Sequence, residues 1–356
     1  TEAGGRDGVQ LVVVVALGCL DGQRDRVVDA VEEGLAGGVA AGVIGALTGF
    51  TQPVITAVIC GPAAVRLGVR PNQSAGMIAH AGHIGNLAGF THPTQVAILA
   101  TAGIGYGLFN VLGFIAAGSI FVLSAIRATA DMRRRGIKID AAEKARIIQE
   151  IENREYSTTS WKAFFPFLVL VIGFICGLPI FLVGMAAAIV TMMLAHASPK
   201  QAELDMMKGV SLIATPLVAT IGFLFMSTVI REIGMVQTVS DFVSPVLSVQ
   251  PVLILFAVAF LTGFMTQSYA ASVAVLVPFL QVTLQTGADP FASAFAAASG
   301  CSLIQYFLTG GPVAALSTVI PVIPGSDLKG ANAFQRPSIL FGCLVAFIIT
   351  ACLAFL

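Results

Sequence analysis

Charged residues are scarce in this chain of 356 amino acids: they make up 11% of it, whereas hydrophobic residues make up 56%. A soluble domain carries about 25% charged residues. The mean hydropathy here is +0.90. The formal net charge is zero, so the sequence also lacks the basic footprint of a nucleic-acid-binding protein. This composition predicts an integral membrane protein with the lipid bilayer as a partner and no nucleic acid.

Acidic residues are absent from long parts of the chain. None occurs between Leu35 and Ile126, and Asp289 is the only one between Phe242 and Ser326. Acids embedded in a membrane mark cation sites and proton relays. Their absence argues against a cation substrate and against a carboxylate proton shuttle. The absence of acids favours an anionic substrate, because acidic side chains would repel an anion.

Motifs of cofactor binding and catalysis are lacking as well. The six cysteines stand singly in apolar runs, without a Cys-x-x-Cys pair, so they predict neither a disulfide framework nor a zinc site. The two glycines at 310 and 311 are not followed by the Lys-Ser/Thr of a phosphate loop. No Gly-x-Ser-x-Gly nucleophile motif is present. We expect a protein that is not an enzyme and has no cofactor, with a coupling ion, Na⁺ or H⁺, left open.

Two stretches far apart in the chain share one pattern, the first from Gly49 to Gln95 and the second from Gly263 to Pro312. Each opens with Gly-Phe and a Thr-Gln pair, then has a proline inside an apolar run and a second proline that begins the next run. A third proline follows the second at the same distance in both stretches. These prolines are Pro62, Pro71 and Pro93 in the first stretch and Pro278, Pro290 and Pro312 in the second. The pattern predicts an internal duplication, and paired broken apolar segments are typical of secondary transporters.

The apolar pieces between these interruptions are mostly too short to cross about 30 Å of hydrocarbon as single helices. Exposed non-helical backbone would leave polar groups unpaired in lipid, so the breaks must face protein or a watery cavity. We therefore predict an all-α integral membrane protein of two repeats with broken or re-entrant helices. We expect the repeats to be inverted, which requires an odd number of crossings between them. The expected helical pieces are 35–48, 53–66, 73–88, 94–104 and 105–126 in the first repeat and 249–262, 268–286, 290–308, 312–323 and 338–356 in the second.

Charge and hydropathy divide the chain into five parts. Nine Arg or Lys against six Asp or Glu in the one long polar stretch place it on the cytoplasmic side by the positive-inside tendency. The predicted parts are an N-terminal segment without assigned function (1–34), the first transport repeat (35–126), the cytoplasmic polar linker (127–162), connecting scaffold helices (163–248) and the second transport repeat (249–356).

Neutral hydrogen-bonding groups gather at the breaks. A helix that begins just after a break adds free N–H groups and about half a positive charge. Together these groups predict a substrate site that grips two carboxylates without a buried arginine, although each polar side chain alone could instead bond a neighbouring carbonyl. The first set is Thr51, Gln52, Asn86, Thr91, His92, Thr94 and Gln95, and the second is Thr266, Gln267, Ser268, Thr309 and the backbone of Gly310 and Gly311.

Three histidines offer an alternative of another class. His80 and His83 lie three apart on one helical face, and His92 follows the break, so an intramembrane metal-dependent enzyme could use them. A catalytic zinc requires three well-placed ligands and an open position, and no carboxylate or thiolate accompanies these residues. We favour packed or substrate-facing histidines, with His92 the best candidate for contact, and predict no metal site. An anion channel is the third class.

Six stretches carry a resemblance to a known family: 49–52, 67–71, 264–279, 289–300, 307–315 and 327–334. They resemble the anaerobic C4-dicarboxylate (Dcu-type) carriers, over roughly residues 40–356. The likeness implies a multi-pass carrier of a bacterial inner membrane that moves succinate, fumarate, malate or aspartate by exchange (antiport) or ion-coupled uptake (symport). The run from Thr91 to Thr94 also resembles the His-Pro turn of gluconate permeases, which belong to the same wider superfamily of organic-anion carriers. A sugar acid is therefore the alternative substrate, and a homo-oligomer is left open.

Overall fold

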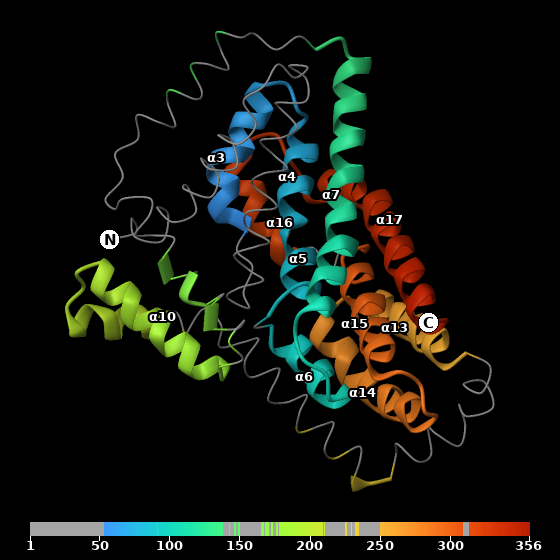
Figure 1. Cartoon of the computed structure of the whole chain (residues 1–356). Coiled ribbons are helices and arrows are strands. Elements are labelled where there is room, and N and C mark those ends of the chain that lie inside the picture. The colour runs from blue at the N-terminus through green and yellow to red at the C-terminus, as the bar shows by residue number, and fades with distance from the viewer. Residues whose placement is uncertain are drawn as a thin grey trace.

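A computed structural model shows an all-helical protein (Figure 1). It describes residues 53–90, 92–137, 178–208, 250–308 and 313–356, with isolated positions and short pieces between 142 and 234, and no strand occurs in these parts. The helices are α3 (Pro53–Arg66), α4 (Pro71–Ala79), α5 (Ala81–Leu87), α6 (Pro93–Ala102), α7 (Leu108–Arg134), α10 (Ile180–Leu194), α13 (Pro251–Thr266), α14 (Tyr269–Gln285), α15 (Pro290–Ile304), α16 (Val313–Val319), the 3-10 helix η1 (Ile320–Val322) and α17 (Leu328–Ala354).

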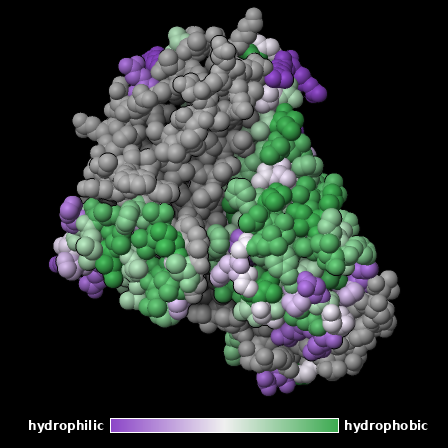
Figure 2. Space-filling view, in the orientation of Figure 1, coloured by the Kyte–Doolittle hydropathy of each residue, from purple (hydrophilic) through white to green (hydrophobic). Residues whose placement is uncertain are grey.

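Two of the described helices, α7 and α17, are long and apolar enough to cross a membrane, with 27 residues each. At about 1.5 Å per residue each exceeds the thickness of the hydrocarbon core. Large apolar side chains such as Leu108 and Ile115 of α7 and Leu344 and Phe347 of α17 are exposed. Figure 2 shows this apolar surface on one flank of the molecule, with hydrophilic residues beyond its ends. Such a surface suits contact with lipid, in agreement with the predicted membrane protein.

Helices α13 and α15 pack closely because glycines line their contact. A Cβ atom at Gly263 would lie 2.6 Å from the carbonyl oxygen of Cys301, and one at Gly300 would lie 2.9 Å from that of Phe256. Only glycine permits backbones to approach this far. Small residues at helix contacts are typical of membrane proteins, where close packing replaces the hydrophobic driving force.

Two short helices pack against the opposite end of the chain. Helix α6, from the first third, packs against α14 and α15, and α16, from the last third, packs against α3 and α4 (Figure 1). The arrangement is reciprocal. Segments next to the breaks are therefore covered by helices from the other region, as the cost of exposing broken backbone to lipid requires.

Helix α17 begins at Leu328, whereas the sequence predicts a helix only from residue 338. The prediction was wrong because the polar residues before Pro337 are typical of a loop. In the fold Asn332 and Gln335 are buried inside protein, where Asn332 bonds to the turn after α15 and Gln335 bonds to α4. Helix α7 likewise continues to Arg134, past the predicted end at 126. The single piece predicted at 73–88 is divided at His80 into α4 and α5. The other described helices agree with the predicted pieces to within a few residues.

The start of α17 provides a test by pH. The Asp327 carboxylate accepts hydrogen bonds from the Gly330 N–H at 2.7 Å and from Asn72 Nδ2 at 2.8 Å, and these bonds lower the pKa of Asp327. The cap therefore stabilises the protein above the unfolded pKa of about 3.9 and loses its effect as the pH falls through the lower folded value. We expect Asp327→Ala to lower the Tm at pH 7 and to have little effect on it well below pH about 4.

Asp327→Asn is the matched control, since asparagine also caps helices but does not titrate. Its Tm should stay closer to that of the wild type at pH 7. An equal loss of Tm in Asp327→Ala at both pH values, measured by thermal unfolding in detergent, would contradict the role of the ionised cap.

Candidate functional site

The interruption between α5 and α6 is enclosed by α7. Asn110 of α7 donates through Nδ2 to the carbonyl oxygens of Ala88 and Gly89, both at 3.1 Å. A Cβ atom at Gly113 would lie 2.4 Å from the carbonyl oxygen of Leu87, so α7 runs directly against the interruption. The carbonyls that the broken helix leaves unpaired are thus satisfied by protein.

The first turn of α6 connects this interruption to α14. Gln95 donates through Nε2 to the carbonyl oxygen of Leu87 at 3.0 Å, and its Oε1 accepts a hydrogen bond from the Tyr269 hydroxyl at 2.6 Å. The His92 ring lies 5.3 Å from the Tyr269 ring. Thr94 is buried in the same turn. We call His92, Gln95 and Tyr269 the junction, because they join segments that are far apart in the sequence.

The interruption between α13 and α14 lies beside the junction, because Tyr269 is the first residue of α14. Its hydroxyl groups bond to one another: Thr266 Oγ1 lies 2.7 Å from Ser272 Oγ, which donates to the Ser268 carbonyl oxygen at 2.8 Å. Ser268 caps α14, accepting from the Ala271 N–H at 3.4 Å. Thr266 and Ser268 therefore shape this turn, the local role that the sequence left open for them.

Gln267 adopts an unusual backbone conformation, with a φ of 51°. Left-handed backbone at a residue other than glycine costs about 1–2 kcal/mol, and such positions cluster at functional sites. His196 is the only other non-glycine residue with positive φ in the described part of the chain. The side chain of Gln267 is half-buried at the turn. A strained residue that keeps an amide side chain where glycine would fit better is a strong candidate for ligand contact.

Histidine and helix ends give the junction its chemistry. His92 Nδ1 is buried and has no hydrogen-bond partner among the described residues. Helices α6 and α14 both begin here, each adding free N–H groups and about half a positive charge. These groups suit a small anion. Thr51, Gln52, Thr91, Thr309, Gly310 and Gly311, which complete the predicted site, lie outside the described residues.

A second buried polar group, the histidine cluster, consists of His80, His83, Ser124, Tyr306 and Gln335. His80 Nε2 lies 2.9 Å from Ser124 Oγ, and His80 Nδ1 lies 3.5 Å from Gln335 Nε2. The His83 ring lies 4.6 Å from that of Tyr306 and 5.4 Å from that of His80. Both histidines are fully buried. The cluster brings together residues of α5, α7 and α17 with residues of the turns that follow α4 and α15.

The structure separates the residues that the sequence grouped into one site. Asn86 belongs with the histidine cluster, because its Nδ2 donates to the Tyr306 hydroxyl at 3.0 Å. His92 lies at the junction against Tyr269. No three His, Cys, Asp or Glu side chains come together to hold a metal ion in the described part of the chain. The described structure thus does not bring His80, His83 and His92 together as one ligand set.

Several polar residues of these two groups were missed by the sequence analysis, among them Tyr269 and Tyr306. Tyr269 stands one residue after the Thr-Gln-Ser turn, so its position next to a predicted break was a usable signal. Asn110, Asn332 and Gln335 lie on long helices, where nothing local distinguishes them. Only the packing of α7 and α17 brings them to the breaks and the cluster.

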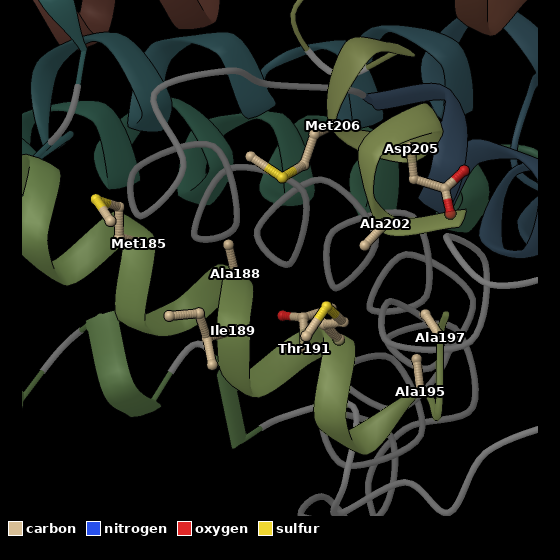
Figure 3. A pocket seen from close by; sticks show the side chains of 10 residues that line it. Met185, Ala188, Ile189, Thr191, Ala195, Ala197, Ala202, Asp205 and Met206 are labelled. Carbon is tan, nitrogen blue, oxygen red and sulfur yellow. The ribbon is translucent and has the colours of Figure 1, made fainter. Parts of the chain in front are cut away.

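An apolar hollow beside α10 is of a different kind (Figure 3). Its walls are methionine, alanine and isoleucine side chains, with Asp205 the one charged residue. An apolar wall that carries an acidic side chain does not suit a carboxylate substrate, so this hollow is not the predicted site. The lining residues are Met185, Ala188, Ile189, Thr191, Met192, Ala195, Ala197, Ala202, Asp205 and Met206.

The fold resembles that of a transporter of known structure, the YdaH transporter of Alcanivorax borkumensis, whose crystal structure revealed an unusual topology. The two share 15% sequence identity with a TM-score of 0.50, over 98% of this chain and 82% of that one. No protein-family model and no curated protein matches the sequence. The likeness shows a shared fold, in agreement with the predicted all-α membrane protein, and leaves the Dcu-type relationship a prediction.

Proposed function

We propose that this protein is a secondary active transporter of small organic carboxylates, with C4-dicarboxylates such as succinate, fumarate, malate and aspartate as the first choice. It would work in a bacterial inner membrane. The fold shared with the YdaH transporter supports transport in general. The observation that carries the proposal is the junction, where Tyr269 bonds to Gln95 across 174 positions of sequence and so joins two broken helices.

An anionic substrate is supported by the charges near the junction. Helices α6 and α14 both start there, and no acid lies in the described residues from Pro53 to Ile126. Asp289, the single acid between residues 250 and 308, instead caps α15 by accepting from the Ala292 N–H at 2.7 Å. A carboxylate at the junction would meet hydrogen-bond donors and positive helix ends without repulsion. A Na⁺ ion alone would find no carboxylate ligand there.

The mechanism we propose is alternating access by two repeats. In the predicted duplication α3, α6 and α7 correspond to α14, α16 and α17, and α4 with α5 corresponds to α15. The packing is consistent with this correspondence: α6 lies on α14 and α15 just as α16 lies on α3 and α4. Two units related in this way can rock about a site held between them.

Exchange of labelled succinate in proteoliposomes tests the proposal. Vesicles loaded with unlabelled acid should accumulate labelled succinate, and competition by fumarate, malate, aspartate and gluconate should separate a dicarboxylate from a sugar-acid carrier. Imposed Na⁺ and pH gradients identify the coupling ion. Exchange absent for every acid would reject the proposal. Unitary currents without exchange would indicate an anion channel. Stoichiometric zinc in the purified protein would support the alternative of a metal-dependent enzyme.

The strained residue at the second break gives a sharp variant, Gln267→Gly. Glycine removes the side chain and accepts the positive φ, so folding should be unharmed or improved. Loss of a hydrogen bond to a charged group costs about 1.5–3 kcal/mol, on the order of a ten- to hundredfold loss of affinity. We expect that loss in succinate uptake at low concentration. Gln285→Gly, at the exposed end of α14, is the control for transport, and equal uptake by both variants would remove Gln267 from the site.

A further inference from the structure

The surroundings of the His83 side chain are energetically unfavourable for it. Its ring is fully buried, and neither Nδ1 nor Nε2 has a hydrogen-bond partner among the described residues. It cannot turn away easily, because Tyr306 packs against it and stands so close that a Cβ atom at Gly82 would lie 2.7 Å from the Tyr306 hydroxyl. A buried polar group without a partner costs about 1–3 kcal/mol. An ionisable residue inside a membrane that bears this cost calls for a functional explanation.

His80, three residues earlier, is fully engaged. Ser124 donates its hydroxyl proton to Ser338 Oγ at 2.8 Å, so Ser124 Oγ accepts from His80 Nε2. The remaining nitrogen, Nδ1, faces the amide of Gln335, which also donates to the Gly76 carbonyl oxygen at 3.0 Å. This network assigns His80 as the neutral tautomer with its proton on Nε2. His83 is thus the histidine of the cluster with an unused lone pair.

The charges nearest the cluster are positive. Arg127 of α7 donates to the Phe334 carbonyl oxygen and to Ser338 Oγ, and Arg336 of α17 donates to the Phe307 carbonyl oxygen at 3.0 Å. Tyr306 is the remaining titratable group against His83 besides His80. A proton on His83 would add a further positive charge to this surrounding.

The acids of the packed helices are engaged elsewhere. Asp131 of α7 pairs with Arg70 and Arg135 at 2.9 and 3.0 Å. Asp289 caps α15, and Asp327 caps α17. The described residues therefore provide no carboxylate to compensate a protonated His83. A buried charge is costly unless it is paired, and among the described residues none is placed to pair with it, so we expect a mobile anion as its partner.

The cluster is connected to the proposed substrate path through Asn86. This residue lies one turn after His83 on α5, bonds to Tyr306 and is followed directly by the interruption that leads to the junction. Tyr306 is itself held in place by Asn332, whose Nδ2 donates to the Tyr306 carbonyl oxygen at 3.2 Å. An anion near the break and a proton on His83 can thus influence each other across few bonds.

We propose that His83 binds the proton that this protein carries together with its substrate; the proposal rests on the transport function above. The proton comes from water on one side of the membrane and adds to the free ring nitrogen, which turns the neutral imidazole into an imidazolium. It leaves to water on the other side, and no other bond is made or broken. The positive charge is stable in the core only while a carboxylate is bound. The proton and the substrate therefore cross the membrane together.

Proteoliposomes with imposed pH gradients test this inference, with labelled succinate as the probe. In the wild type, uptake should follow an inwardly directed proton gradient, and a pH dye inside the vesicles should report acidification that depends on succinate. In His83→Gln the gradient-driven uptake and the acidification should be lost, whereas exchange of internal for external succinate, which needs no net proton movement, should persist. His196→Gln, the same change at an exposed histidine, should behave as the wild type.

The outcomes separate the two proposals. Absence of succinate exchange in the wild type rejects the transport function itself. Exchange together with an unchanged response of His83→Gln to the pH gradient overturns the role of His83, as does wild-type uptake without acidification. If His83→Gln fails to fold, His83→Asn and the uptake of protons on succinate binding, measured in detergent for the wild type, replace it. No proton bound by the wild type would then overturn the inference.

Discussion

Gly113→Ala is expected to abolish folding of the membrane core, although the substitution adds a single methyl group. The new Cβ atom would lie 2.4 Å from the Leu87 carbonyl oxygen, which is backbone and cannot turn aside. Helix α7 would have to move away from the break, and Asn110 would lose its bonds to the Ala88 and Gly89 carbonyl oxygens. Overpacking alone costs about 1–3 kcal/mol, and each buried group left unpaired costs a similar amount.

The matched control lies on the same helix. A Cβ atom at Gly118 meets nothing within 4 Å, so Gly118→Ala should be tolerated and should gain about 1 kcal/mol from the higher helix propensity of alanine. Thermal unfolding in detergent, monitored by size-exclusion chromatography, measures both variants. If the two have the same Tm, the close approach of α7 to the break is not what holds this region.

Gln95→Leu should remove succinate uptake while the protein still enters the membrane. The leucine fills a similar volume but leaves the Leu87 carbonyl oxygen and the Tyr269 hydroxyl without their partner in a buried place. The expected cost is about 1–3 kcal/mol for each group. Both ends of the junction would shift, since Gln95 is the side chain that joins them. Gln285→Leu is the control, because Gln285 is exposed at the end of α14.

A double-mutant cycle with Tyr269→Phe sharpens this prediction. If Gln95 and Tyr269 act through one hydrogen bond, the Tm losses of the single variants should add to more than the loss of the double variant, because the second change removes a group that already lacks its partner. Strict additivity would indicate that the 2.6 Å bond contributes nothing to the junction.

The sequence predicted the fold well where prolines and apolar runs alone decide it. Helices α3 and α15 begin at Pro53 and Pro290 as expected, since proline fits the first turn of a helix. Prediction failed at α17, where Asn332 and Gln335 resemble loop residues until their buried partners are known. Local composition cannot tell a solvated polar residue from one that bonds across the core.

The site was predicted only in part for the same reason. The sequence placed His92 beside the break correctly, and the structure puts it against Tyr269. The sequence also assigned Asn86 to this site, but Asn86 bonds to Tyr306. A shift of three or four residues along a helix changes the partner that a side chain contacts. Of the histidine cluster, the sequence indicated only that His80 and His83 lie on one helical face, since the other members come from separate helices or turns.

The reciprocal packing of α6 and α16 also bears on biosynthesis. Gln95 emerges from the ribosome 174 residues before Tyr269, its bonding partner. At about 5–20 residues per second, the interval is on the order of ten to thirty seconds. During that time the first third of the nascent chain must wait at the translocon with a broken helix that α14 and α15 do not yet cover. A stalled or truncated chain would therefore present the Gln95 amide without its Tyr269 partner inside the bilayer, a feature by which quality-control proteases could distinguish it from the finished protein.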